Sequence, residues 1–149
     1  MKEKLVLSVL VDNESGVLQR VASLFSRRAY NISSLTVSET EDPNFSRMTI
    51  ETNTEPENFR QIKRQLLKLE IVEKVSELTP DNSVSSELLL VKVHAQGIPE
   101  KNALLAFTGA GEMLDAFIQR LEQRFSIVEM ARTGVTSLER GAGSFTDDI

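Results

Sequence analysis

The feature that most restricts the fold of this 149-residue chain is the order of apolar patterns in residues 1–78. Runs typical of strands are interleaved with two runs of helical periodicity, in the order strand, helix, strand, strand, helix, strand. A unit of this order packs both helices on one face of an antiparallel sheet. The sequence therefore predicts a ferredoxin-like β-α-β-β-α-β domain over residues 1–78.

The strand and helix predictions rest on different periods. Two strands alternate apolar and polar residues around a polar turn, and the first and last strands are mainly aliphatic. The expected strands are residues 5–11, 32–38, 47–51 and 72–78. The helices carry apolar residues three and four apart, which gives each one buried face. These residues are Leu18, Val21, Ala22 and Phe25 in the first helix, and Phe59, Ile62, Leu66 and Leu69 in the second.

A polar stretch without periodicity, residues 79–86, predicts a linker between two domains. Residues 87–149 then begin with a strand and end with a helix and a strand, as a second ferredoxin-like α+β domain would. The small polar residues from about 141 onward are expected to form a frayed tail.

The second domain is shorter than the first. Only residues 94–102 separate its first strand from the strand-like run 103–107, which is too few for a helix and another strand. Either the domain has lost a helix–strand unit, or a disordered segment near residues 99–102 is missing from the sequence. We favour the missing segment, because a shortened domain would expose one face of its sheet.

Composition excludes several classes of function. The net charge is −5, and neither half of the chain is basic, which argues against nucleic acid as a partner. Cysteine is absent, so disulfides and thiolate chemistry are excluded. No signal peptide or long apolar run is present, and we expect a cytoplasmic, bacterial protein. An organellar protein whose transit peptide has been removed would have the same composition.

Signatures of an enzyme are weak. His94 is the single histidine, at the end of an apolar strand, and reads as a structural or surface residue. The sequence Gly109-Ala110-Gly111 lacks the third glycine of a phosphate loop and is typical of an ordinary turn from strand to helix. Asp147 and Asp148 lie in the tail as solvating charge.

The best candidate for a ligand site is the junction at residues 13–18, between a buried strand and a helix. Gly16 lets backbone approach a ligand, and the helix N-terminus offers unpaired N–H groups suited to a carboxylate. Asn13 adds an amide donor and a carbonyl acceptor. These features suit a free amino acid. The alternative is that Asn13 only caps the helix and Gly16 only turns the chain.

These residues resemble those of the ACT domain, a module that binds amino acids at dimer interfaces. A longer set of motifs looks like the small-subunit family of acetohydroxyacid synthase, also called acetolactate synthase. The motifs are Asn13-Glu14-Ser15-Gly16, Tyr30-Asn31-Ile32 with Ser34-Leu35-Thr36-Val37, Ser46-Arg47-Met48-Thr49-Ile50, Val75-Ser76-Glu77-Leu78, Leu90-Val91-Lys92-Val93, and Ala131-Arg132-Thr133-Gly134 through Arg140-Gly141.

The resemblance implies a regulatory subunit without an active site, a cofactor or a metal of its own. Members of the family form homodimers through the ACT domain, with one continuous sheet across two chains. They associate with a catalytic subunit that holds thiamine diphosphate, magnesium and FAD, raise its activity, and confer feedback inhibition by valine.

The resemblance also implies which residues bind valine. They are Asn13, Glu14, Ser15, Gly16, Val17 and Leu18 from one chain, with Asn31 and Ile32 from the other. Ala29 departs from the family, which has glycine there; a positive φ at this position would cost stability. Arg47 lies on the strand face opposite Met48 and Ile50 and is expected to reach a partner or to be solvated.

Two other functions stay open at this stage. The chain could be a free-standing ACT-domain sensor that acts on another partner. It could also be a small enzyme on a ferredoxin-like scaffold, because fold alone does not determine function.

Overall fold

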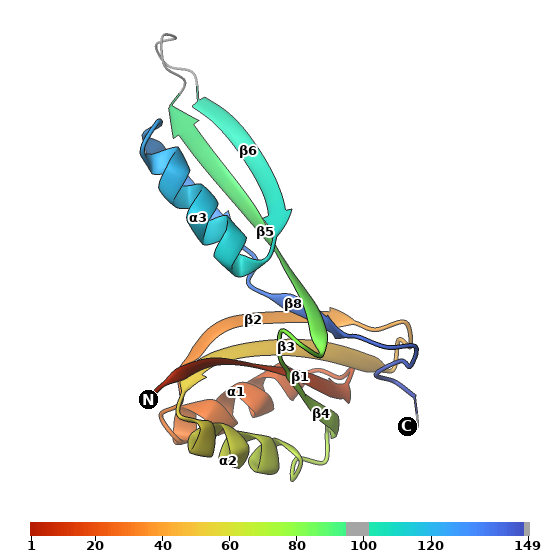
Figure 1. Cartoon of the computed structure of the whole chain (residues 1–149). Helices are drawn as coiled ribbons and strands as arrows, with labels where there is room; N and C mark the ends of the chain where they lie inside the picture. The colour runs from red at the N-terminus through yellow and green to blue at the C-terminus, as the bar shows by residue number, and fades with distance from the viewer. Residues whose placement is uncertain (95–101, 148–149) are drawn as a thin grey trace. The chain divides into compact units, whose positions relative to one another are not determined.

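The computed structural model describes residues 1–94 and 102–147 (Figure 1). The chain divides into two compact units, residues 1–84 with 137–149 and residues 85–136. Each unit has its own sheet, and the fold class is α+β, as predicted.

The first unit is the predicted ferredoxin-like domain. Its antiparallel sheet has the strand order β2-β3-β1-β4, and both helices pack on the same face (Figure 1). The elements are β1 (Glu3–Asp12), α1 (Val17–Arg27), β2 (Ile32–Glu39), β3 (Phe45–Thr54), α2 (Pro56–Leu66) and β4 (Val72–Leu78). The observed helices and strands follow the sequence periodicity closely, because each apolar stripe has a sheet or helix to pack against.

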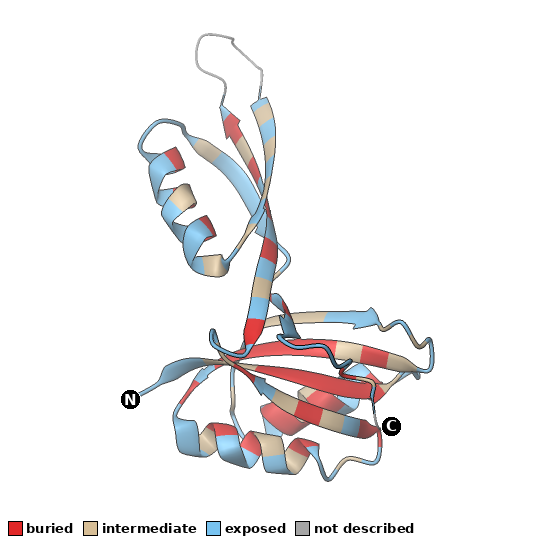
Figure 2. Cartoon of the chain, turned by 45° about the vertical axis from the view of Figure 1, so that its right-hand side comes forward, coloured by how far each residue is buried: buried red, intermediate tan, exposed pale blue. Residues whose placement is uncertain are grey.

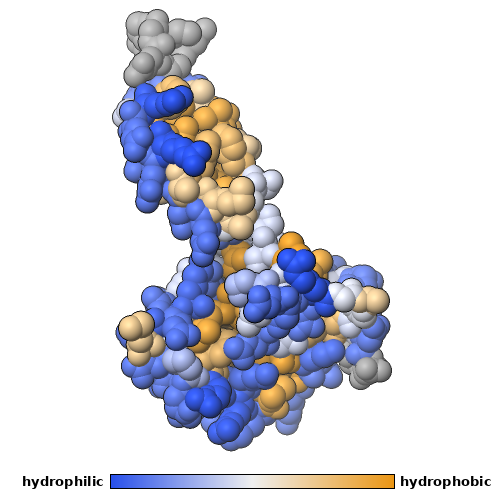
Figure 3. All heavy atoms as spheres, in the orientation of Figure 1, coloured by the Kyte–Doolittle hydropathy of each residue, from blue (hydrophilic) through white to orange (hydrophobic). Residues whose placement is uncertain are grey.

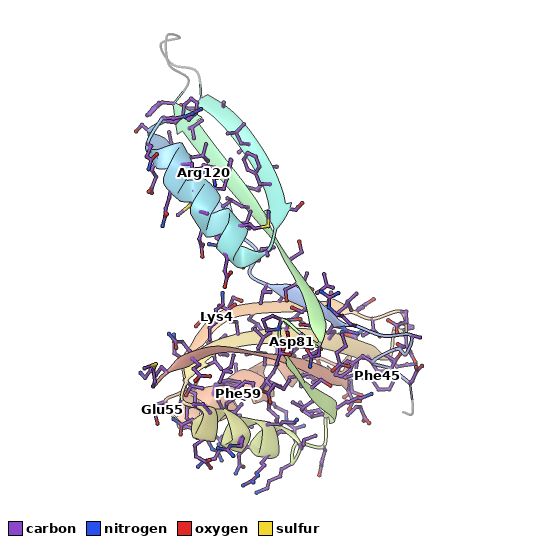
Figure 4. All side chains as sticks on the ribbon, in the orientation of Figure 1. Lys4, Phe45, Glu55, Phe59, Asp81 and Arg120 are labelled. Atoms are coloured by element: carbon purple, nitrogen blue, oxygen red, sulfur yellow. The ribbon has the colours of Figure 1, made fainter. Side chains whose placement is uncertain are left out.

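The core of this unit lies between the sheet and its helices. Val9 in β1 pairs with Met48 in β3, and both side chains are almost fully buried. Phe25 of α1 and Phe59 of α2 pack into the same cluster, at 1% and 2% exposure. Figure 4 labels Phe59 on α2, and Figure 2 shows buried residues on both helices. Burying a side chain of this size contributes about 1.5–3 kcal/mol, so this layer is the main source of stability.

The other face of this sheet is also covered, although none of the described helices lies on it. Leu10 in β1 is fully buried, and residues 137–147 run along this face (Figures 1 and 2). Phe145 is only 6% exposed. The expectation of a frayed tail from about residue 141 is therefore wrong for the described residues, because the tail packs on the ACT-type sheet.

The second unit has one sheet with the order β6-β5-β7 and one helix, α3, in its described part. Its elements are β5 (Ser83–His94), β6 (Asn102–Gly109), α3 (Gly111–Glu122) and β7 (Ile127–Arg132). The strand β8 (Thr136–Glu139) pairs with β5, but all of it except Thr136 belongs to the first unit. Since β5 begins at Ser83, half of the predicted linker is strand. The strand β8 was not predicted.

The described part of the second unit has fewer helices and strands than a complete ferredoxin-like fold. β5 and β6 are antiparallel neighbours whose last pair is His94 with Asn102. The predicted junction lies mostly at residues 95–101, outside the described part of the chain. On the sheet face away from α3, Leu90 and Leu104 are 38% and 68% exposed, as a shortened domain requires. On the side drawn in Figure 3, apolar residues gather over β6 and α3.

Candidate functional site

The loop between β1 and α1 is shaped by Gly16. This residue is the N-cap of α1 and has φ 86° and ψ −9°, in the left-handed region that favours glycine. A Cβ atom at Gly16 would have no neighbour within 4 Å, so the backbone here is open to an approaching group. Glu14 and Ser15 are exposed in the same turn. Val17 is buried at 4% exposure and anchors the helix, whereas Leu18 is 46% exposed.

The N-terminus of α1 has no capping side chain and no acidic residue in its first turn. The first N–H groups of a helix have no partner within the helix, and the helix dipole adds partial positive charge there. Asn13 does not cap this helix, whereas Gly16 does turn the chain into it, so only the first part of the simpler explanation fails. The geometry at Gly16, Val17 and Leu18 therefore suits a carboxylate ligand.

The amide of Asn13 is held by the turn between β2 and β3. Its Nδ2 donates to Glu39 Oε1 at 3.1 Å and to the carbonyl of Pro43 at 2.9 Å, and its Oδ1 accepts from Ser46 Oγ at 2.9 Å. The backbone N–H of Asn13 donates to the carbonyl of Asn44 at 2.8 Å. Asn13 thus fixes the position of the loop and the turn together.

Asn31 and Ile32 lie at the opposite end of the sheet from Asn13. Ile32 and Leu5 both pair with Thr52, and Leu5 is seven residues before the end of β1 at Asp12. At about 3.3 Å per residue this places Ile32 roughly 23 Å from the loop along the strand direction. Thr52 Oγ1 donates to the carbonyl of Asn31 at 2.7 Å. Within one chain the two halves of the expected site do not meet.

Sequence analysis missed Glu39, Pro43 and Ser46 as partners of Asn13. They are brought there by the register of β3 against β1, in which Asp12 pairs with Phe45. The two alternating strands of the predicted hairpin were the available signal, but their pattern alone leaves the register unspecified.

Arg47 lies on the sheet face opposite the helices, as predicted, but it is neither freely solvated nor directed away from the chain. Its guanidinium carbon is 4.9 Å from the centroid of the Phe145 ring. Burial lowers the pKa of Arg47 from its ordinary value, and the charges of Glu41 and Glu139 oppose that shift.

His94 is exposed at the end of β5. Among residues 1–94 and 102–147, no group of three His, Cys, Asp or Glu side chains could hold a metal ion. None of the helices in the same ranges is long and apolar enough to span a membrane.

Two family models match the chain, one for each half. A model described as an AHAS small subunit-like ACT domain matches residues 7–74, and a model for the small subunit of acetolactate synthase matches residues 98–141. The acetolactate synthase isozyme 3 small subunit of Salmonella typhimurium is 42% identical over 91% of this chain and 95% of its own length. This chain belongs to the acetolactate synthase small-subunit family.

Other members of the family agree with this assignment. The probable acetolactate synthase small subunit of Methanothermobacter thermautotrophicus is 40% identical over 92% of this chain and 93% of its own. The crystal structure of the acetolactate synthase small subunit from Thermotoga maritima superposes with a TM-score of 0.83 at 34% identity, covering 95% of this chain and 99% of that one. The family resemblance that the motifs predicted is therefore confirmed for both halves of the chain.

The alignments also show a difference in length. The Salmonella alignment is 155 residues long, although it covers only 91% of a chain of 149 residues. The small subunit of Salmonella therefore carries residues that have no counterpart here.

Proposed function

We propose that this chain is a non-catalytic regulatory subunit of acetolactate synthase. It binds the catalytic large subunit, raises its activity and makes it sensitive to inhibition by valine. The observation that carries the proposal is the uncapped N-terminus of α1 behind Gly16, in a chain of this family. A free-standing amino-acid sensor is the second candidate, and the same site would serve it.

The proposed site binds the carboxylate of valine on backbone N–H groups at Gly16, Val17 and Leu18. The positive end of the α1 dipole favours that charge. Asn13 orients the loop through its bonds to Glu39 and Pro43 rather than as the main ligand contact. Glu14 and Ser15 line the exposed side of the turn.

A homodimer would complete this site. β2 is an edge strand with partly exposed apolar side chains, including Val37 at 43% exposure. If two copies pair their β2 strands antiparallel about a two-fold axis at Thr36, Thr36 lies opposite its own copy, and Ile32 of one copy lies opposite Thr40 of the other, next to Glu39. Glu39 already accepts a bond from Asn13. Asn31 and Ile32 of the second chain would then close the valine site.

The reaction itself belongs to the partner. Thiamine diphosphate, magnesium and FAD are held by the catalytic subunit in this proposal, and this chain carries none of them. Valine that binds only the dimeric arrangement shifts the population toward it, which gives the coupling between effector and enzyme. The proposed location is the cytoplasm.

The test is acetolactate formation by the cognate catalytic subunit with and without this chain, across a titration of valine. We expect a higher rate with the chain and a return toward the unassisted rate with valine. A higher rate that valine leaves unchanged would mean that the effector is wrong. If the chain changes nothing but still binds valine in calorimetry, the free-standing sensor is the better description.

A further inference from the structure

The outer face of the first sheet carries a row of three residues from neighbouring strands. Leu10 in β1 pairs with Arg47 in β3 on one side and with Lys74 in β4 on the other. Directly paired residues project to the same face of a sheet, so two cations flank one fully buried leucine. Such a row requires a cover that is apolar in the middle and tolerates charge on both sides.

Phe145 from the C-terminal tail provides that cover. Its ring centroid lies 4.9 Å from the guanidinium carbon of Arg47 and 5.1 Å from Nζ of Lys74. Nζ of Lys74 also donates to the carbonyl of Phe145 at 3.3 Å. The ring is 6% exposed, and a partly desolvated cation near a ring face is attracted by its quadrupole.

The residues on either side of Phe145 form hydrogen bonds to the turn between β2 and β3. Oε1 of Glu41 accepts from Ser144 Oγ at 2.8 Å and from Thr146 Oγ1 at 2.7 Å. The turn is internally braced as well, since the backbone N–H and the side-chain amide of Asn44 both donate to Oδ1 of Asp42, at 2.9 and 2.8 Å.

The same turn holds Asn13 from its other side, through Glu39, Pro43 and the carbonyl of Asn44. Hydrogen bonds therefore connect the tail to residues 39–46, and residues 39–46 to the loop before Gly16. We propose that residues 144–146 are a positioning element for the effector site, which keeps Asn13 and the loop in the conformation that binds the amino acid.

This inference rests on the proposed valine site, but its structural part can be tested without valine. Loss of the Phe145 ring frees the turn, so the backbone amides of residues 40–46 exchange faster with solvent. A site that must order its own loop binds more weakly, and a coupling of ordinary size corresponds to about fivefold or more in affinity.

The experiment uses the 149-residue chain and compares Phe145→Ala with two other variants. Phe145→Tyr keeps the ring and is expected to retain both valine binding and the slow amide exchange of residues 40–46. Phe125→Ala removes a 36% exposed ring from the second unit and controls for the loss of an aromatic side chain. The readouts are amide hydrogen exchange of residues 40–46 without ligand and calorimetric titration with valine.

The expected result is faster exchange and at least about fivefold weaker valine binding in Phe145→Ala alone. Faster exchange with unchanged valine affinity would show that residues 144–146 do not position the effector site. Unchanged exchange would show that the tail does not order the turn. If the unsubstituted chain binds no valine, the proposed function fails, while the exchange data still decide whether the tail orders the turn.

Discussion

The carboxylate of Glu87 in β5 lies against Gly111, the first residue of α3. A Cβ atom built on Gly111 would be 2.6 Å from Glu87 Oε1. The same carboxylate accepts from Arg132 at 2.9 Å, and the Glu87 side chain is only 5% exposed. Negative charge at a helix N-terminus is favourable, so the turn at residues 109–111 receives a carboxylate from its own chain rather than a phosphate.

Gly111→Ala is therefore expected to destabilise the second unit. The new methyl group would push Glu87 away from Arg132, and disturbing a buried charged hydrogen bond costs about 1–3 kcal/mol. Thermal unfolding followed by circular dichroism measures the effect. Gly109→Ala is the matched control, because its Cβ would meet only Leu114 Cδ2 at 3.9 Å. Equal losses in both variants would contradict the role of Glu87.

Ala29→Gly is expected to stabilise the chain. Ala29 has φ 55°, and its N–H and that of Tyr30 donate back to the carbonyls of Ser26 and Phe25, which is a Schellman end to α1. A residue with Cβ in this conformation costs roughly 1–2 kcal/mol, part of which the greater freedom of unfolded glycine offsets. Urea unfolding should show a gain of about 1 kcal/mol. Ala22→Gly inside α1 should show the opposite sign.

The fold of the first unit was predictable because its signals are periodic. The alternating strands β2 and β3 and the apolar stripes of α1 and α2 each need an apolar surface to pack against. The ferredoxin-like arrangement, with both helices on one face of the sheet, supplies that surface for all four elements. The packing of Phe145 was not predictable in the same way. It is a single ring in a small polar segment, and its contacts come from strands that are far away in sequence.

The candidate site likewise has parts that the sequence predicts and parts that it does not. The turn at Gly16 and the helix behind it are local and follow from residue types. The hydrogen bonds of the Asn13 side chain depend on the register of β3 against β1, which the apolar pattern does not specify. Asn31 and Ile32 entered only through the family resemblance, and one chain alone does not bring them to the site.

The pKa of Glu41 reports on the tail. Hydrogen bonds from Thr146 and Ser144, with the backbone N–H of Glu41 itself, lower this pKa from 4.5 to about 2. A carboxyl group whose pKa is lower in the folded state stabilises that state above pH 4.5, and the contribution disappears as the pH falls toward 2. Carbon-detected NMR titration should find the low value in the unsubstituted chain. In Thr146→Val it should move toward 4.5, whereas an unchanged pKa would show that Thr146 is not its main cause.

Val37→Lys is expected to prevent the proposed dimer. Val37 lies on the edge strand β2 at 43% exposure, and a symmetric β2 interface would bring two lysines close together. Light scattering after size exclusion should give the mass of one chain instead of two. Leu67→Lys is a suitable control, because Leu67 is 51% exposed just after α2 and outside the sheet edge. If both variants remain dimeric, the interface lies elsewhere.

Substitution of Gly16 separates the charge requirement of the effector site from its shape. Aspartate and asparagine have the same size, and both tolerate the left-handed backbone better than most residues do. The Cβ position at Gly16 is open, so neither side chain should clash and both variants should unfold at similar temperatures.

The two variants should differ in their response to valine. Gly16→Asp places a carboxylate where the ligand's own carboxylate is expected to bind, which should raise the inhibitory concentration of valine at least about tenfold relative to Gly16→Asn. Inhibition of the reconstituted enzyme measures this ratio. If the two variants are inhibited equally, the carboxylate of the effector does not lie at the N-terminus of α1, because no other difference between them would remain to hide its repulsion.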